Sequence, residues 1–185
     1  MRLSLQPHPQ SRCESLTGIA VDVGRLGPRR LRLRFELCGG ARHVVMPPFA
    51  IAPARRDGLW QHSCFEAFLR AGDDDVYYEF NFAPSRDWAA YRFSGYRNGM
   101  TEIRAMRSIR IELDRDLAPT ALTAWLELDR LPELPVDRPW HLGLAAVIEE
   151  RNGRRSYWTL AHPPGAPDFH HPDCFALELA AAKPI

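Results

Sequence analysis

The chain has 185 residues, of which 45% are hydrophobic and 25% charged, and its formal net charge is +1. A hydrophobic fraction of this size supports a packed core and argues against a disordered or fibrous chain. The near-zero net charge gives no overall field that would attract nucleic acid or an acidic membrane surface, so neither is expected as a partner. We expect one domain over residues 1–185, because no linker, repeat or low-complexity run divides the sequence.

The sequence gives no indication of export. No segment approaches the roughly 18 uninterrupted apolar residues that a membrane-spanning helix needs. Residues 1–10 contain two prolines and no continuous apolar run, unlike a signal peptide. The four cysteines lack the CxxC spacing of a structural zinc site, which favours reduced thiols and a cytoplasmic location and leaves two disulfides as the alternative: Cys13, Cys38, Cys64 and Cys174.

A period of two between apolar and polar residues recurs along the chain and predicts β-strands. In residues 31–37, for example, leucines and Phe35 alternate with arginines and Glu36, so one face is apolar and the other charged. The predicted strands are, in chain order, residues 19–23, 31–37, 58–69, 76–82, 109–113, 122–128, 142–150, 156–162 and 175–179.

Turn residues separate these strands. Leu26-Gly27-Pro28 lies between the first two, and Asn152-Gly153 is typical of a tight hairpin turn, because both residues tolerate a positive φ. No convincing long amphipathic helix is present. The pattern predicts an all-β fold, an antiparallel β-sandwich of about ten strands that is jelly-roll or immunoglobulin-like.

A polar cluster is predicted where two strands form a hairpin. Alternation places His62 and Glu66 on one face of the first strand, and Glu79 and Asn81 on one face of the next. Such groups need partners, whether ligand hydroxyls, a cation or one another. The alternative is that they only tie loops to the sheet by pairing with nearby arginines, namely Arg86, Arg92 or Arg97.

Aromatic residues lie within the same stretch and suggest a sugar as the ligand. Trp60, Trp88, Tyr91 and Tyr96 surround the acidic and amide residues, and Trp125 lies on the polar side of its own strand. Aromatic faces stack on the apolar C–H faces of a sugar, while polar groups bond its hydroxyls. The alternative for Trp60 and Trp88 is that they fill the core. The candidate ligand-binding residues are Trp60, His62, Glu66, Glu79, Asn81, Trp88, Tyr91 and Trp125.

Other chemistries have weaker support in the sequence. The histidines and aspartates of residues 162–173 suggest a transition-metal site, although adjacent His170 and His171 point in opposite directions in extended backbone. The alternative, which we favour, is a loop packed by Phe169 and its prolines whose histidines bond the backbone, so we assign no metal ligand. Residues 73–75, three aspartates, suggest calcium or a solvated turn. Glu66 and Glu79 are the minimum for a glycosidase. Nucleophile elbows, phosphate-binding loops and dinucleotide fingerprints are absent, so we assign no catalytic residue and do not expect an enzyme.

Two runs carry a resemblance to a known family. Gly58–Leu69, followed by Tyr77-x-Glu79-Phe80-Asn81-x-x-Pro84 and a tryptophan, resembles bacterial DOMON-like domains, which are relatives of the family 9 carbohydrate-binding modules. Tyr157-Trp158 and residues 162–175 resemble the C-terminal part of these proteins. The resemblance implies a β-sandwich of about ten strands that binds either sugars or haem.

The two kinds of relative imply different sites. In the sugar-binding relatives two tryptophans clamp the terminal sugar, and the candidates here are Trp60, Trp88, Trp125 and Trp158. In the haem-binding relatives Met with His or Lys holds the iron, but Met46, Met100 and Met106 stand in no motif that matches.

We therefore expect a non-catalytic domain that binds a carbohydrate or a sugar-containing small molecule. A haem b-binding or redox-partner domain is the alternative, and a glycoside hydrolase using Glu66 and Glu79 is a third. No cofactor is required by the first hypothesis, although haem or calcium would be compatible with the sequence. The oligomeric state is left open.

Overall fold

The computed structural model describes residues 1–115, 118–131 and 133–182. In these residues twelve strands and four single-turn 3-10 helices form, and every pairing between strands is antiparallel. The predicted all-β antiparallel class is confirmed. The first six strands are β1 (Arg2–Pro7), β2 (Leu16–Gly27), β3 (Arg30–Gly39), β4 (Cys64–Ala71), β5 (Tyr77–Phe82) and β6 (Trp88–Phe93). The others are β7 (Thr101–Glu102), β8 (Arg110–Asp114), β9 (Thr120–Glu127), β10 (Trp140–Glu149), β11 (Arg155–Thr159) and β12 (Leu177–Leu179).

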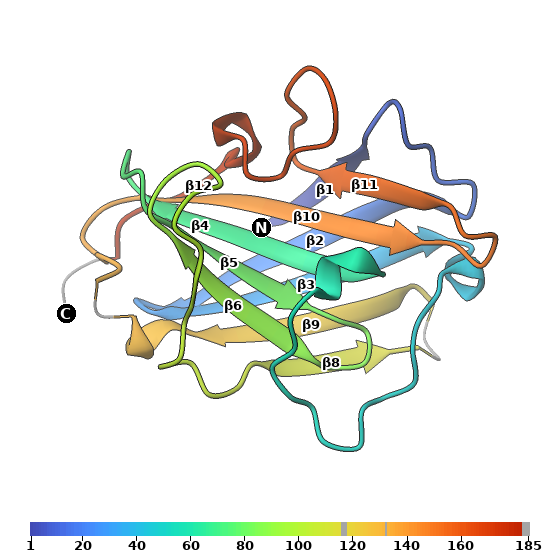
Figure 1. Cartoon of the computed structure of the whole chain (residues 1–185), viewed down its shortest axis with the longest axis horizontal. Helices are drawn as coiled ribbons and strands as arrows, with labels where there is room; N and C mark the ends of the chain where they lie inside the picture. The colour runs from blue at the N-terminus through green and yellow to red at the C-terminus, as the bar shows by residue number, and fades with distance from the viewer. Residues whose placement is uncertain (116–117, 132, 183–185) are drawn as a thin grey trace.

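The strands form one curled sheet whose two halves face each other (Figure 1). The order is β7-β6-β5-β4-β10-β11-β1-β2-β3-β9-β8, with β12 paired to β10. Strand β1 joins the halves, because its first residues pair with β2 and its last two with β11. We call β4–β7 and β10–β12 the front half, and β2, β3, β8 and β9 the rear half.

The main core lies between the halves. Phe35 of β3 and Phe65 of β4 are five strands apart in the sheet, yet their ring centroids are 5.1 Å apart. The apolar face of residues 31–37 points into this core, as the alternation predicted. Burial of these apolar side chains from both halves is the main stabilising term for such a fold.

The outer face of the front half is also covered. All six residues of β5 are buried, which a strand with one solvated face would not show. A second apolar cluster lies on this outer face, beneath the loops that follow β6 and β11: Phe68, Tyr77, Ala89, Tyr91, Phe93, Ala145, Val147, Phe169 and Phe175. The candidate site lies in this second layer.

The structure differs from the predicted strands in a few places. Strands β1, β6 and β7 were not predicted; β6 has few polar residues to alternate, because both of its faces are buried. Residues Leu59–Gln61 form the 3-10 turn η2 rather than strand, which takes Trp60 out of the alternation. The predicted Asn152-Gly153 turn joins β10 to β11, with Gly153 at a φ of 84°. Among the described residues, no helix has the length and apolar character needed to span a membrane.

Candidate functional site

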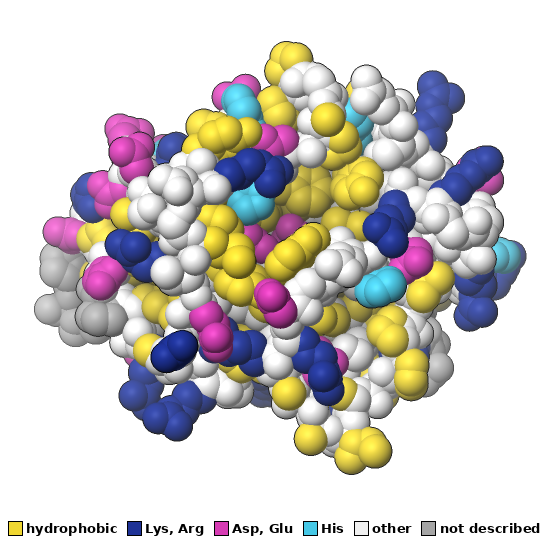
Figure 2. Space-filling view, viewed as in Figure 1, with side chains coloured by type: hydrophobic (Ala, Val, Ile, Leu, Met, Phe, Trp, Pro, Cys, Tyr) yellow, Lys and Arg dark blue, Asp and Glu magenta, His cyan; other side chains and the backbone are white. Residues whose placement is uncertain are grey.

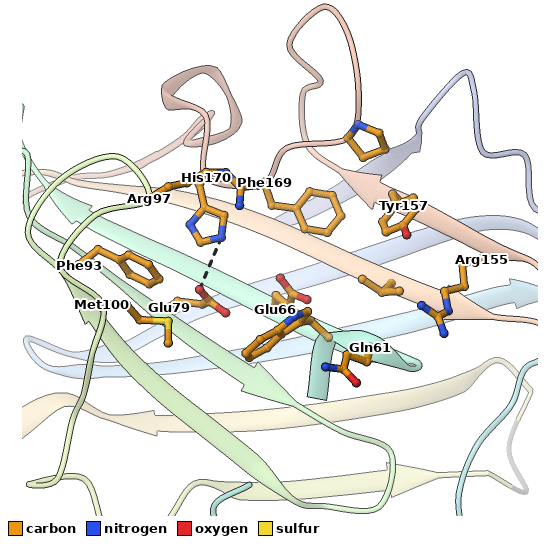
Figure 3. A pocket seen from close by; sticks show the side chains of 13 residues that line it. Gln61, Glu66, Glu79, Phe93, Arg97, Met100, Arg155, Tyr157, Phe169 and His170 are labelled. Carbon is orange, nitrogen blue, oxygen red and sulfur yellow. Dashed lines mark ion pairs between the residues drawn. The ribbon is translucent and has the colours of Figure 1, made fainter. Parts of the chain in front are cut away.

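A pocket of about 470 Å³ opens on the outer face of the front half. Figure 2 looks onto this face, where acidic side chains lie within a hollow bordered by hydrophobic, basic and histidine side chains. The residues that line the pocket come from β4, β5, β6, β10, β11, η2 and two loops: Trp60, Gln61, Glu66, Glu79, Phe93, Arg97, Met100, Val147, Arg155, Tyr157, Pro167, Phe169 and His170 (Figure 3).

The pairing of β4 with β5 places Glu66, Glu79 and Asn81 at the bottom of the pocket, which we call the floor. Glu66 of β4 stands opposite Asn81 of β5, and Glu79 lies two residues before Asn81 on the same face. On the other side of β4, the small side chain of Ala145 stands opposite Glu66. Two acids and an amide therefore gather on adjacent strands, next to a position that leaves room above the sheet.

The two floor carboxyls are almost completely buried. Glu66 is 3% exposed and Glu79 is 5% exposed. Asn81 Nδ2 donates to Glu79 Oε1 at 2.7 Å, whereas no described residue donates to Glu66 Oε1. Burial, with the nearby Glu79 carboxyl, raises the pKa of Glu66 well above its usual range, and burial raises the pKa of Glu79 to about 7. Both groups therefore bind protons more readily than a solvated glutamate.

His170 lies above Glu79 and is held in one orientation. The backbone N–H of Arg97 donates to the Tyr77 hydroxyl at 3.2 Å, and that hydroxyl lies 2.8 Å from His170 Nδ1. We infer from this chain that the hydroxyl donates to Nδ1 and that Nε2 carries the proton. Nε2 lies 3.8 Å from Glu79 Oε2 (Figure 3). Burial, and secondly the charge of Arg97, lower the pKa of His170 to about 4, so the ring is neutral at pH 7.

Asp168 joins the two loops that cover the pocket. Its Oδ1 accepts from Arg97 Nη2 at 2.7 Å and from the His170 backbone N–H at 3.1 Å, and its Oδ2 accepts from the Tyr96 hydroxyl. Arg97 has a φ of 51°, a conformation uncommon for residues other than glycine, which the surrounding contacts hold in place. The charge of Arg97 is thus paired with Asp168.

Aromatic side chains form the walls. Trp60, Phe93, Tyr157 and Phe169 line the pocket together with the thioether of Met100. Trp60 is 37% exposed, and its ring meets that of Tyr91 edge to face with centroids 6.0 Å apart. The pocket therefore combines acceptors at the floor with apolar surface around them.

Five of the eight predicted ligand-binding residues come together here. Trp60, Glu66 and Glu79 line the pocket itself. Asn81 is fully buried below and orients Glu79, while Tyr91 lies beside Trp60 and donates its hydroxyl to Asp57.

The structure places the other three elsewhere. His62 is exposed, and its Nδ1 lies 2.8 Å from Glu149 Oε2. Trp88 lies in the main core, because it is three residues from Tyr91 on β6 and so points to the opposite face. Trp125 is on β9 of the rear half, with the Arg110 guanidinium 4.4 Å from its ring centroid. The predicted hollow therefore does not include these three side chains.

Several lining residues were not among the predicted ligand-binding residues. Tyr157 and Arg155 are two residues apart on β11 and so share a face, and the order of the strands places that face beyond β10, on the same side of the sheet as the floor acids of β4 and β5. His170 and Phe169 belong to residues 162–173, which were considered as a metal site because of their histidines. In the structure both side chains line the pocket. The long connections that bring these segments together are not visible in local periodicity.

The residues considered for metal binding have other partners. His162 Nε2 lies 2.9 Å from the Gln6 carbonyl oxygen, and His171 Nδ1 accepts from the Asp173 backbone N–H at 3.2 Å. Within residues 1–115, 118–131 and 133–182, no three His, Cys, Asp or Glu side chains are grouped as metal ligands. All four cysteines are free thiols.

Fold and site together define a curled antiparallel β-sheet protein with a pocket on the outer face of one half. No family model matches the sequence, and no curated protein matches it. Among solved structures, a Bacteroides uniformis protein provisionally described as carbohydrate-binding superposes with a TM-score of 0.64 at 12% identity. The match covers 94% of this chain and 83% of that one, which shows a shared fold.

A family 9 carbohydrate-binding module from Caldicellulosiruptor kristjanssonii is more distantly similar. Its complex with cellotriose matches with a TM-score of 0.47 at 14% identity, over 88% of this chain and 75% of that one. Its complex with glucose matches with a TM-score of 0.45 at 14% identity, over 84% and 71%. These scores are too low to establish a common fold.

Proposed function

We propose that the protein is a non-catalytic carbohydrate-binding domain that takes a sugar, or a sugar-containing small molecule, in the pocket above β4 and β5. A sugar offers hydroxyl donors to the buried acceptors of the floor and apolar C–H faces to the rings of the walls. A pocket of about 470 Å³ is within the range of small-molecule sites.

The observation that carries the proposal is the state of Glu66. Its side chain lines the pocket, it is 3% exposed, and its Oε1 has no donor among the described residues. Leaving a buried acceptor unpaired costs about 1–3 kcal/mol, more if the group is charged. A ligand that donates to Glu66 recovers this free energy on binding, whereas a purely apolar ligand does not.

The arrangement of the two acids supports binding rather than hydrolysis. Glu66 and Glu79 are diagonal neighbours on adjacent strands, a relationship that places such residues about 7–8 Å apart on one surface. In glycosidases the two carboxyls flank the scissile bond and divide the roles of acid and base or nucleophile. Here both lie side by side on the floor and both have a raised pKa, so neither is set apart as the ionised partner.

The shared fold is consistent with this proposal, since the Bacteroides uniformis protein is described in the same terms. We also propose that the curled sheet is a jelly-roll-type sandwich of the kind found in DOMON-like domains. The ground for this part of the proposal is the Tyr77-x-Glu79-Phe80-Asn81 motif. This motif supplies Glu79 to the floor and Asn81 to hold it.

Haem binding is a second candidate because Met100 and His170 line the same pocket. These are the residue types that ligate haem iron. However, His170 Nδ1 is engaged by Tyr77 and Nε2 faces Glu79, so iron ligation would require the ring to leave both partners. A Soret band after reconstitution with haemin would favour this candidate over the first.

The test of the main proposal is a titration with a panel of mono- and disaccharides, followed by tryptophan fluorescence and by the melting temperature. We expect at least one sugar to shift both signals in the wild-type protein and to lose affinity in Trp60→Ala. If no sugar in a broad panel shifts either signal, the proposal is wrong.

A further inference from the structure

The floor of the pocket holds two acids, Glu66 and Glu79, and the basic residues near them do not form ion pairs with them at pH 7. Arg97 is paired with Asp168 at 2.7 Å, and His170 is neutral at pH 7. Arg155 enters at the end of the pocket away from Glu79, and no ion pair within the described residues joins it to either floor acid (Figure 3). Among the residues that the structure describes, no cation therefore lies between the two carboxyls.

The hydrogen-bonding groups of the floor also favour a ligand that supplies donors and a positive charge. Ionised Glu66 and Glu79 offer only acceptors, and the hydrogen bond that Asn81 Nδ2 donates goes to Glu79, while Glu66 Oε1 has no donor among the described residues. A ligand hydroxyl brings one donor but also two lone pairs, which face the carboxylate oxygens unfavourably. An ammonium group brings three donors and no acceptor, so it can satisfy both carboxylates at once.

The walls also suit a cation. Trp60, Phe93, Tyr157 and Phe169 line the pocket, and the faces of such rings attract a positive charge by about 0.5–2 kcal/mol, depending on its desolvation. A neutral ligand would make use of the ring surface but not of this electrostatic attraction.

We propose that the ligand carries a protonated amine, as an amino sugar does, and that its ammonium group binds between Glu66 and Glu79. This inference rests on the proposed carbohydrate-binding function and narrows its ligand class. The ammonium group takes the place of the proton that a buried acid pair otherwise retains.

The experiment compares matched sugars by isothermal titration calorimetry at pH 6. Each set contains the 2-amino sugar, its N-acetyl form and the parent hydroxyl sugar, in the gluco, galacto and manno series. We expect an amine to bind at least tenfold more tightly than both matched neutral sugars in one series. Because Glu79 has a pKa of about 7 and that of Glu66 is also raised, binding should release protons, which appear as a dependence of the heat on buffer ionisation enthalpy.

Glutamine variants assign the effect to the floor. Glu66→Gln and Glu79→Gln keep the size of each side chain and remove its charge, and we expect both to lose the tenfold preference and the proton release. Glu127→Gln, on β9 of the rear half, is the matched control and should retain both. Melting temperatures show that each variant is folded, and Glu66→Asp provides a second variant that keeps the charge and should keep part of the preference.

The outcomes separate this inference from the proposed function. Equal binding of amine and neutral sugars overturns the inference and leaves carbohydrate binding in place. Binding of a simple amine such as cyclohexylamine as tightly as the amino sugar supports the ammonium site and overturns the carbohydrate proposal. An absence of binding by all of these compounds overturns both.

Discussion

The Tyr77 hydroxyl lies 2.8 Å from His170 Nδ1, although the two residues are 93 positions apart in the chain. This contact joins β5, which forms the floor of the pocket, to the loop that covers it. It also fixes the tautomer of His170, so that an N–H rather than a lone pair faces Glu79. The pocket is therefore held open in a defined shape by polar contacts and not only by packing.

Removing this hydroxyl should weaken the cover of the pocket. For Tyr77→Phe we expect a loss of about 0.5–1.5 kcal/mol in the free energy of unfolding, the usual value of one hydrogen bond. Sugar affinity should fall several-fold, because His170 is no longer held. Urea unfolding and the fluorescence titration measure the two effects, and an unchanged stability together with unchanged affinity would contradict the assigned role.

Trp60 should contribute to binding but little to folding. Because its ring is 37% exposed and lines the pocket, Trp60→Ala is expected to lower sugar affinity about tenfold, which corresponds to about 1.4 kcal/mol. Trp125→Ala is the matched control, since Trp125 lies on the rear half. Equal effects of the two substitutions on affinity would place the ligand elsewhere.

Trp88 should contribute to folding rather than to binding. It is 3% exposed in the main core, with the Arg55 guanidinium 4.4 Å from its ring centroid. We expect Trp88→Ala to lower the free energy of unfolding by about 3–5 kcal/mol, as for other large-to-small core substitutions. A loss below about 1 kcal/mol in denaturant unfolding would show that the side chain does not pack as described.

The stability of the protein should depend on pH through Glu79. Its pKa is about 7 in the folded protein and near 4.5 when the chain is unfolded, so the folded state binds more protons between these values. The contribution of Glu79 is therefore fully present below about pH 4.5 and is lost as pH rises through 7, by up to about 1.4 kcal/mol per pH unit.

The comparison that isolates this effect is between wild type and Glu79→Gln. The lowered pKa of His170, about 4, makes stability rise with pH between that value and the usual pKa of histidine. The stability curve of the wild type alone therefore combines the effects of Glu79 and His170. The stability of wild type relative to Glu79→Gln should fall from pH 5 to pH 7. A difference that stays constant over this range would show that Glu79 has an ordinary pKa.

Strands with one polar and one apolar face could be predicted from the sequence, because their residues alternate. Residues 31–37 alternate and were recognised, whereas β6 is buried on both faces and shows no alternation. The turn η2 lies inside the predicted strand 58–69, because that prediction rested on the shortness of the segment and on the turn at residues 71–75 that leads into β5, and neither locates where the strand begins. Periodicity reports one exposed face and therefore gave no signal for β6, although β5 was predicted despite being buried on both faces.

The floor of the site was predictable because it depends on a single hairpin. Glu66, Glu79 and Asn81 are brought together by β4 and β5, which are adjacent in sequence. The walls and cover come from β11 and the loop containing His170, whose position depends on the order of strands in the whole sheet. Long-range contacts of this kind leave no local signal in one sequence.

The most direct test of a sugar site is a crystal structure with the tightest-binding saccharide of the panel. The structure should show the sugar ring against Trp60, with a donor group of the sugar within about 3.2 Å of a carboxyl oxygen of Glu66 or Glu79. Density for the saccharide at another surface, with the pocket above β4 and β5 filled only by water, would contradict this account.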